Sequence, residues 1–322
     1  MLPFFDLGFI KIPSYSLMLV LGVIAYAINL VLILKKEGKE PPVINKALTV
    51  TLFAFAVMGI PAFIFDSIFH SIEVGYLVFG GITWAGGVVG SFPAFVILTH
   101  YFIKEERGSE IEFFSLVVPG IVLGHAFGRI GCFLGGCCFG GVTESCLGVV
   151  FPTGSPAAQT YPNTITGEGS FPVLPTQLFE AGFELLLYLF MMIFRKKFKY
   201  NNAEIYLISY GIFRFMLEFL RGDSRGATCF FISPSQFLSI ILIITGVLII
   251  LFKKRLVFTS LYDKLSLWRE QVKNGVYTAP TNVESKNAEI YKEIELLHGL
   301  YQKGILTEEE YQSKKAELLN KI

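Results

Sequence analysis

The chain has 322 residues, of which 53% are hydrophobic and 16% are charged, and its mean hydropathy is +0.58. Soluble globular proteins carry nearer to about 25% charged residues, so most of this sequence is suited to lipid rather than to water. The formal net charge of +1 excludes the broad basic surface typical of nucleic-acid binding, and we expect no nucleic-acid partner.

Seven apolar segments are long enough, or nearly so, to cross a hydrocarbon core about 30 Å thick. The predicted spans are 14–34, 46–69, 77–103, 111–127, 175–194, 203–220 and 233–252. The first is not expected to be a cleaved signal peptide, because no basic region precedes it and its apolar run is too long. The sequence therefore predicts an all-α polytopic membrane protein with about seven transmembrane helices.

Basic residues are distributed unevenly between these spans. Cytoplasmic connections are enriched in lysine and arginine, and an outside N-terminus gives thirteen such residues in the cytoplasm against four outside. The thirteen are Lys35, Lys36, Lys39, Lys46, Lys104, Arg107, Arg195, Lys196, Lys197, Lys199, Lys253, Lys254 and Arg255. The four are Lys11, Arg129, Arg221 and Arg225. We expect the N-terminus outside and the C-terminus in the cytoplasm of a cell that places this chain in its plasma or inner membrane.

Two longer regions lie outside the predicted spans: an outer connection at 128–174 and a C-terminal tail at 256–322. The outer connection at 128–174 is rich in glycine, proline, threonine and cysteine, and connections of this length are typically functional. We predict a small ordered head there, within a membrane domain at 1–255. A linker at 256–287 and a cytoplasmic helical hairpin at 288–322 complete the predicted organisation, with Lys303–Gly304 as the turn. Thr307 and Glu310 have the spacing of a capping box.

Ionisable residues inside membrane spans are costly and mark functional sites. The candidates gather towards the outer helix ends: Tyr15, Asp66, His125, Arg129, Gln177, Glu180, Tyr210, Arg214, Glu218, Arg221 and Asp223. Tyr210, Arg214 and Glu218 recur every four residues and share one helix face. Arg214 and Glu218 could form a buried ion pair without further function. Arg129 has no obvious carboxylate near it in the sequence, and two arginines at membrane depth favour an anionic ligand such as a phosphate.

Glycine is concentrated in and after the third and fourth spans. Gly120, Gly124 and Gly128 have a spacing that lets helix backbones approach closely. Gly135–Gly136 and Gly140–Gly141 fall in the outer connection, where we expect their backbone amides to face a lipid headgroup.

Several segments carry a family resemblance: GHAFGRIGCFLGGCCFGG (124–141), YPNTI (161–165), LPTQLFEA (174–181) and YLISYGIFRFMLEFLRGDSRG (206–226). SYSLMLVLG (14–22) and GGITWAGGVVG (80–90) occur in the same order. Together they resemble the prolipoprotein diacylglyceryl transferases, from about residue 10 to residue 255. The resemblance implies transfer of diacylglyceryl from phosphatidylglycerol to the lipobox cysteine of a secreted preprotein, which yields a thioether-linked lipoprotein precursor and glycerol phosphate. The implied partners are phosphatidylglycerol and prolipoprotein signal peptides.

The resemblance also implies roles for individual residues. Arg129 matches the arginine of the family's G-R-x-G signature, and Gly140 matches the glycine that closes that signature. Tyr15 matches a tyrosine of the first helix, and Tyr210, Arg214 and Glu218 match the Tyr, Arg and Glu of the sixth. The implied catalytic residues are His125, Arg129, Arg214 and Glu218, and the implied substrate-binding residues are Tyr15, Arg129, Gly140, Tyr210 and Arg214.

The chain departs from the family pattern at four positions. The signature G-R-x-[GA]-N-F-x-N-x-E-x-x-G has Cys132 in place of its first Asn, Gly135 in place of its second and Cys137 in place of its Glu. The histidine of the third span is replaced by Ala85. Another base must then accept the thiol proton, and His125, one helical turn before Arg129, is the candidate, with Glu180 and Glu218 as weaker substitutes because a carboxylate base needs a raised pKa.

All five cysteines lie on the outer side in the expected topology: Cys132, Cys137, Cys138, Cys146 and Cys229. One or two disulfides are one interpretation, since bridges persist outside the cell. A nucleophilic thiolate is another, and Cys132, Cys137 and Cys138 form the candidate variant site. A metal site is a third, but the C-x4-C-C spacing lacks the usual C-x2-C pairs. We therefore predict no metal and no cofactor.

Two further interpretations stay open. The chain could be a non-catalytic or divergent paralogue that binds lipid, a thiol or a metal through its cysteine-rich loop. The segment LLHGLYQKGILTEEEYQSKKAELL (296–319) resembles the short C-terminal domain family, which implies docking or self-association of the hairpin.

Overall fold

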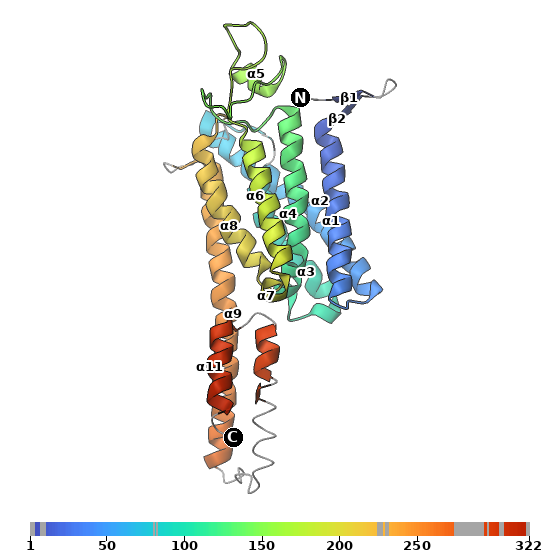
Figure 1. The fold of residues 1–322 in the computed structure, drawn as a ribbon, viewed down its shortest axis with the longest axis vertical. Coiled ribbons are helices and arrows are strands. Elements are labelled where there is room, and N and C mark those ends of the chain that lie inside the picture. The colour runs from blue at the N-terminus through green and yellow to red at the C-terminus, as the bar shows by residue number, and fades with distance from the viewer. Residues whose placement is uncertain are drawn as a thin grey trace.

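The computed structural model describes residues 4–6, 11–79, 81, 83–223, 228, 232–273, 293–294, 296–302 and 306–319, and only the backbone of residues 5, 6, 85, 255–273 and 319. These parts of the chain are mainly helical (Figure 1). The long helices are α1 (Ser14–Lys36), α2 (Pro41–Val74), α3 (Trp84–Phe102), α4 (Glu110–Gly135), α6 (Thr176–Ile193), α8 (Asn202–Leu217), α9 (Pro234–Lys273) and α11 (Glu308–Leu319). Shorter elements are α5 (Pro156–Thr160), α7 (Arg195–Phe198), the 3-10 turns η1 (Lys104–Glu106) and η2 (Glu218–Leu220), and the strands β1 (Phe4–Asp6) and β2 (Lys11–Pro13), which pair antiparallel with Phe4 opposite Pro13.

The helices have the length and the surface of membrane spans. Within the described residues, five are long and apolar enough to cross a bilayer: Ser14–Lys36, Pro41–Val74, Glu110–Gly135, Thr176–Ile193 and Pro234–Lys254. Gly86–Phe102 is a shorter apolar helix. Large apolar side chains such as Phe53, Ile60 and Leu186 are more than half exposed, as expected of surfaces that face lipid. The chain is an all-α, multi-pass membrane protein.

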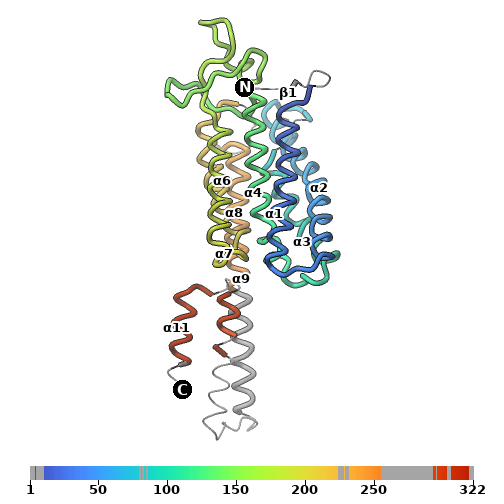
Figure 2. Tube along the Cα trace, turned by 45° about the vertical axis from the view of Figure 1, so that its right-hand side comes forward, coloured from blue at the N-terminus to red at the C-terminus, as the bar shows by residue number. Residues whose placement is uncertain are grey.

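Helix α4 lies at the centre of the bundle, between α1 and α6 (Figure 2). It packs closely on α1 because glycines face each other: a Cβ on Gly22 would come within 2.9 Å of the Gly124 carbonyl oxygen, and one on Gly120 within 2.9 Å of the Tyr26 ring. The close approach predicted for Gly120 and Gly124 is confirmed, whereas a Cβ on Gly128 would lie 4.0 Å from Leu19 Cδ2, at ordinary van der Waals distance. The other main pairs are α2 with α3 and α8 with α9.

Several predicted boundaries differ from the structure. The second helix, predicted at 46–69, covers Pro41–Val74, and the sixth, predicted to end at 220, ends at Leu217. The third helix begins at Trp84 rather than at 77, because Thr83 accepts a capping hydrogen bond from the Gly86 amide (3.1 Å). The fourth continues from 127 to Gly135, since its small residues pack on α1 instead of ending the helix. Helix α9 runs through the first part of the predicted linker to Lys273, because no glycine or proline interrupts it there.

The segment between α4 and α6 is folded, and we call it the head; α4 takes up residues 128–135 of the segment predicted for it. It has a small apolar core of Phe139, Phe151, Ala157 and Val173, separate from the core of the bundle. Backbone bridges join Val173 to Val149 and Val142. Figure 1 shows α5, in the head, beyond the ends of α4 and α6.

The opposite end of the bundle carries most of the connection charges. Glu37 pairs with Arg195 and Lys199, each at 2.7 Å, and Lys46 pairs with Glu105 at 2.7 Å. Beyond this end lies α11, where the capping box is confirmed: the Glu310 amide donates to Thr307 Oγ1 (3.3 Å) and the Thr307 amide donates to Glu310 Oε2 (2.9 Å). The predicted turn at Lys303–Gly304 and the second part of the linker at 274–287 lie outside the described residues.

Candidate active site

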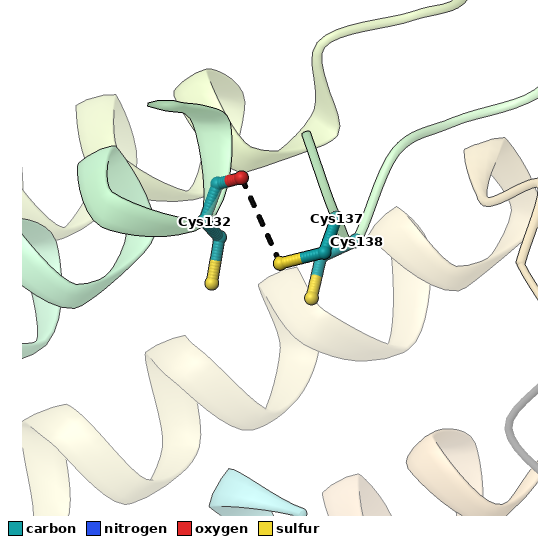
Figure 3. Close-up of side chains that lie close together, drawn as sticks. All are labelled: Cys132, Cys137 and Cys138. Carbon is teal, nitrogen blue, oxygen red and sulfur yellow. Dashed lines mark hydrogen bonds between the residues drawn. The ribbon is translucent and has the colours of Figure 1, made fainter. Parts of the chain in front are cut away.

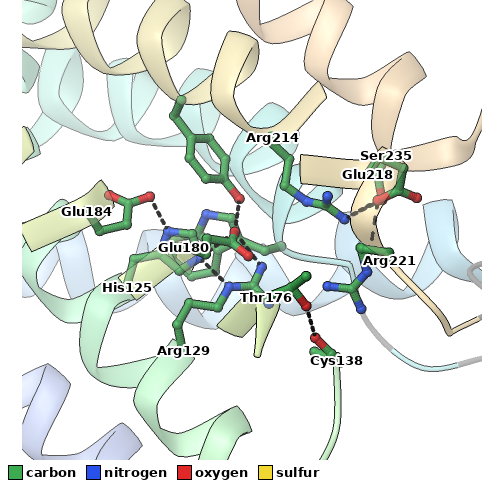
Figure 4. Close-up of polar contacts among 12 residues, drawn as sticks. His125, Arg129, Cys138, Thr176, Glu180, Glu184, Arg214, Glu218, Arg221 and Ser235 are labelled. Atoms are coloured by element: carbon green, nitrogen blue, oxygen red, sulfur yellow. Dashed lines mark hydrogen bonds and ion pairs between the residues drawn. The ribbon is translucent and has the colours of Figure 1, made fainter. Parts of the chain in front are cut away.

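Polar side chains from four segments meet near the head end of the bundle (Figure 4). They come from α4, α6, α8 and the turn η2 that follows α8: His125, Arg129, Glu180, Glu184, Tyr210, Arg214, Glu218 and Arg221. Helical spacing explains the contribution of each element, because His125 and Arg129, Glu180 and Glu184, and Tyr210 and Arg214 each lie four residues apart and so share a helix face. The bundle thus buries ionisable groups at the point where the head begins.

Glu180 joins three of the helices. Its Oε1 accepts an ion-paired hydrogen bond from Arg129 Nη2 (2.9 Å) and a second bond from the Tyr210 hydroxyl (2.8 Å). Glu180 and Tyr210 are fully buried. Arg129 therefore has a carboxylate partner, which its sequence neighbourhood did not reveal because the partner lies on another helix.

His125 is held on both sides of its ring. Its Nδ1 lies 2.8 Å from Glu184 Oε1, and its Nε2 accepts a hydrogen bond from Arg129 Nε (3.2 Å). Its ring also stacks on Trp84 with the centroids 4.1 Å apart. These contacts favour a positioning role towards Arg129. That His125 accepts the thiol proton stays a prediction.

Arg214 and Glu218 form the ion pair that their spacing predicts, with Arg214 Nη2 at 2.7 Å from Glu218 Oε2. Arg214 Nη2 also donates to Ser235 Oγ (2.8 Å) on α9. Its second terminal nitrogen, Nη1, is buried without a hydrogen-bond partner among the described residues. Next to this pair, Arg221 donates to Asp223 (2.5 Å) and lies 3.9 Å from Glu218.

The arginines are thus fixed by carboxylates but not saturated by them. A guanidinium carries five N–H donors in a rigid fork, and the unpartnered Nη1 of Arg214 is one donor that the described residues leave unused. A buried donor without a partner is costly, and an oxyanion placed there would satisfy it. This arrangement is suited to binding a phosphate.

Two predicted binding residues lie at the edge of this cluster. Tyr15, in the first turn of α1, is 37% exposed and packs its ring 3.2 Å from where a Cβ on Gly131 would lie. Gly140 sits between two backbone segments, where a Cβ would come within 2.6 Å of the Leu220 carbonyl oxygen. Glycine is required there for close packing, and a binding role for Tyr15 or Gly140 stays a prediction. Asp66 pairs instead with His70 (3.2 Å) on α2.

The expectation that the glycine amides face a headgroup is wrong for three of the four residues. The Gly136 amide donates to Phe133 O (3.2 Å), that of Gly140 to Leu174 O (2.8 Å) and that of Gly141 to Leu220 O (3.0 Å). The head uses these donors for its own backbone pairing, which the sequence pattern could not reveal.

The cysteines of the variant signature come together (Figure 3). The sulfur atoms of Cys132, Cys137 and Cys138 lie within 4.8 Å of one another. Cys132 is buried and free, and Cys146 is free and exposed. Cys229 and Arg225 lie outside the described residues.

Several contacting residues were not identified as site residues from the sequence, among them Ser235, which accepts a hydrogen bond from Arg214. Glu184 binds His125, Trp84 stacks on it, and Thr176 donates to the Cys138 carbonyl oxygen (2.8 Å). Glu184 had a recognisable signal, because it is a carboxylate in an apolar span four residues after Glu180. Trp84 and Thr176 had none, since aromatic and threonine residues are common at helix ends.

The chain is similar to known proteins over most of its length. Residues 3–252 match the family model described as prolipoprotein diacylglyceryl transferase, and residues 292–319 match the short C-terminal domain. A phosphatidylglycerol–prolipoprotein diacylglyceryl transferase 2 of Clostridium perfringens is 32% identical over 252 residues, which cover 74% of this chain and 90% of that protein. Transferases of the corresponding name from Clostridium tetani and Francisella tularensis subsp. novicida are also 32% identical, over 76% of this chain and over 94% and 90% of their own lengths. The chain, with its arginine–carboxylate site inside the matched region, belongs to the prolipoprotein diacylglyceryl transferase family.

Proposed function

We propose that this protein transfers a diacylglyceryl group from phosphatidylglycerol to the lipobox cysteine thiol of a secreted prolipoprotein. The observation that carries the proposal is the pair of arginines, Arg214 buried and Arg129 largely so, each oriented by a carboxylate, in a chain whose family acts on a phospholipid. Guanidinium groups bind phosphate with two parallel hydrogen bonds. The site therefore matches the one strongly charged group that the lipid carries.

In this proposal Arg129 and Arg214 bind the lipid phosphate and stabilise the charge that develops on it. Glu180 and Glu218 hold the two guanidinium groups in place, and Tyr210 fixes Glu180. Tyr15 and Gly140 line the headgroup side of the site. Preorganised charge of this kind is usually the largest contribution to catalysis.

The reaction is a substitution at carbon. The preprotein sulfur forms a bond to the terminal glyceryl carbon while the bond from that carbon to the phosphate oxygen breaks. The bonding electrons leave on that oxygen, next to Arg129 and Arg214, and glycerol phosphate departs. The thiol proton is lost to a base or to solvent before or during attack.

We also propose the topology and the domain organisation. Helices α1, α2, α3, α4, α6, α8 and α9 would be the seven spans, with the N-terminus outside and the C-terminus in the cytoplasm of the plasma or inner membrane. The head then lies on the outer side, as the uneven distribution of lysine and arginine favours. Residues 1–255 would be the transferase domain, and 288–322 a cytoplasmic hairpin for docking or self-association.

A lipoprotein maturation assay tests the proposed activity. The full chain is expressed in cells depleted of their own transferase, and the purified protein is incubated with phosphatidylglycerol vesicles and a lipobox peptide. Growth and a thioether product are expected for the natural chain. Arg129→Gln and Arg214→Gln should each lower the product by at least about 100-fold, because a donor to the charged transition state is lost.

Arg195→Gln is the matched control. Arg195 also forms a 2.7 Å ion pair, with Glu37, but at the opposite end of the bundle. Its substitution should leave the activity within about twofold, as is usual for a partly exposed pair. Absence of thioether product from the natural chain, in membranes that hold the protein at normal amounts, would contradict the proposal.

A further inference from the structure

The three cysteines of the head boundary are arranged as a cradle rather than as a pair. Helix α4 ends in a tight turn, with Gly136 at φ 72° and the Cys137 amide donating back to the Cys132 carbonyl oxygen (3.1 Å). This turn folds the chain over the end of the helix, so Cys137 and Cys138 return to Cys132. A separation of five residues that looks unsuitable for a metal site in the sequence thus becomes a compact cluster.

The backbone of the cradle is fixed in an unusual conformation. Cys138 has φ 63°, the only positive φ at a non-glycine residue among those the structure describes. Such a residue costs free energy and persists where the surroundings impose it, typically at functional sites. The fully buried Thr176 and Gln177 impose it here, because they donate to the carbonyl oxygens of Cys138 (2.8 Å) and Cys137 (2.6 Å).

We propose that Cys132, Cys137 and Cys138 bind one zinc ion through their three thiolates and leave its fourth position open to the thiol of the incoming preprotein. Their sulfur atoms lie within 4.8 Å of one another. A tetrahedral zinc with Zn–S bonds of about 2.3 Å needs sulfurs about 3.8 Å apart, which small side-chain rotations supply. Three thiolates select a soft or borderline cation, and three protein ligands with one open position are typical of catalytic rather than structural zinc.

The location fits a role in the reaction. Cys132 follows Arg129 by three residues and lies on the same face of α4. Thr176, which holds Cys138, lies one turn before Glu180, the partner of Arg129. The cluster therefore adjoins the proposed phosphate site. Figure 4 shows the Cys138 carbonyl oxygen bonded to Thr176, near Arg129 and Arg221.

A zinc ion at this cluster would help to remove the proton of the preprotein thiol. Both ring nitrogens of His125 are engaged by Glu184 and Arg129, and a zinc ion would supply a second route for removing the thiol proton. Zinc deprotonates a thiol that coordinates it. A zinc-bound hydroxide would take the thiol proton and leave as water, and the bound sulfur would then attack the glyceryl carbon as phosphate leaves. The neutral thioether would then dissociate, and water would return to the zinc and lose one proton to solvent, which restores the hydroxide. The thiol proton thus ends in solvent and the negative charge leaves on glycerol phosphate, so atoms and charge balance.

This inference rests on the proposed function for its mechanistic part, and the zinc site is tested separately from it. The full chain is purified in detergent and its zinc is measured by mass spectrometry, with thiol titration on the same sample. About one zinc ion per chain is expected for the natural protein. Cys132→Ser, Cys137→Ser and Cys138→Ser should each lose most of it, whereas Cys146→Ser, at the exposed free cysteine of the same head, should retain it.

Cobalt(II) then tests the open position, because the absorbance of thiolate-to-cobalt charge transfer increases with each thiolate bound. The cobalt-loaded chain should gain absorbance with a lipobox peptide and show no change with the same peptide carrying serine in place of cysteine. Cys229→Ser should leave both results unchanged. A spectrum that already reports four thiolates and ignores the peptide would overturn the open position, and so would loss of metal from Cys229→Ser.

The two proposals fail in different ways. Less than about one zinc ion per chain, or equal zinc in the serine variants, overturns the zinc site, and thioether formation at the natural rate by a chain without zinc overturns its role in the reaction; both leave the activity standing. A disulfide within the cluster of the active protein would also overturn the zinc site, because it would use the thiolates that the site needs. Zinc and peptide binding without any product from phosphatidylglycerol would overturn the transfer reaction instead. Unfolding temperatures of the serine variants within a few degrees of the natural chain exclude misfolding as the cause of lost metal.

Discussion

Glu180 is the residue through which the site is connected, because one of its oxygens accepts from both Arg129 and Tyr210. Removing one partner of a buried pair leaves an uncompensated charge, which is far more costly than the pair itself is stabilising. The side chains around Glu180 are therefore expected to act together, and substitutions that change one contact at a time are the informative ones.

Tyr210→Phe removes only the hydroxyl that donates to Glu180 at 2.8 Å. We expect a loss of about 2 kcal/mol in unfolding free energy, as for a hydrogen bond to a charged group, and a drop of about tenfold in kcat/KM because the orientation of Glu180 towards Arg129 is relaxed. Tyr26→Phe is the control: it loses an equally short buried bond, to Thr51 (2.8 Å), away from the site. It should be destabilised by about 1 kcal/mol with unchanged kinetics; equal kinetic losses in both variants would contradict the assignment.

His125 distinguishes positioning from proton transfer. His125→Gln keeps an amide oxygen near the place of Nε2, where it can accept from Arg129 Nε, and His125→Ala keeps none. We expect the glutamine variant to retain within about tenfold of the natural kcat and the alanine variant to lose at least about 100-fold. The pH profile of kcat should keep its shape in the glutamine variant. Equal loss in both, with the acidic limb of the profile removed, would assign His125 as the base.

At the scale of elements, close packing of α1 on α4 sets the position of Arg129. Both helices use glycine where they touch, and α4 continues as a helix to Gly135 although its sequence there is rich in glycine. In a membrane such packing, rather than the hydrophobic effect, holds helices together.

Gly22→Ala tests this packing. Its Cβ would meet the Gly124 carbonyl oxygen at 2.9 Å and Phe127 Cβ at 3.2 Å, so the helices must separate, at a cost of about 1–3 kcal/mol. Gly59→Ala on α2 is the control, because no described atom outside the adjoining backbone of its own helix lies within 4 Å of the place its Cβ would take, and the better helix propensity of alanine should stabilise it by about 0.5 kcal/mol. Thermal unfolding in detergent measures both; a neutral Gly22→Ala would show that the interface yields.

The existence and order of the long helices follow from the sequence, because an apolar run of membrane length has few alternatives. Their ends follow less well. Helix α9 passes the predicted start of the linker at 256 because no residue stops it, and α3 starts late because Thr83 caps it. Such ends depend on individual hydrogen bonds and on neighbouring helices, which hydropathy does not contain.

At the scale of the whole molecule, some contacts of the site could be predicted from the sequence and others could not. Arg214 and Glu218 were predicted together because helical spacing places them on one face, whereas the bonds of Glu180 to Arg129 and of Glu184 to His125 join different helices and depend on the assembled bundle. The spacing of the cysteines in the sequence could not predict that they cluster, because the turn that ends α4 brings them together.

Deleting the tail tests whether the two matched regions work independently. Every residue of the proposed site lies between Tyr15 and Arg221, so a chain that ends at Lys273 keeps the site and all of α9. We expect complementation and thioether formation within about twofold of the full chain, since no catalytic contact is removed.

If the hairpin mediates self-association, light scattering should show that the shortened chain forms a smaller particle in detergent. Thr307→Ala in the full chain removes the side-chain cap of α11, a loss of about 1 kcal/mol, and should weaken association without touching the transferase domain. Loss of activity in the shortened chain at equal amounts in the membrane would instead show that the cytoplasmic tail supports the outer site.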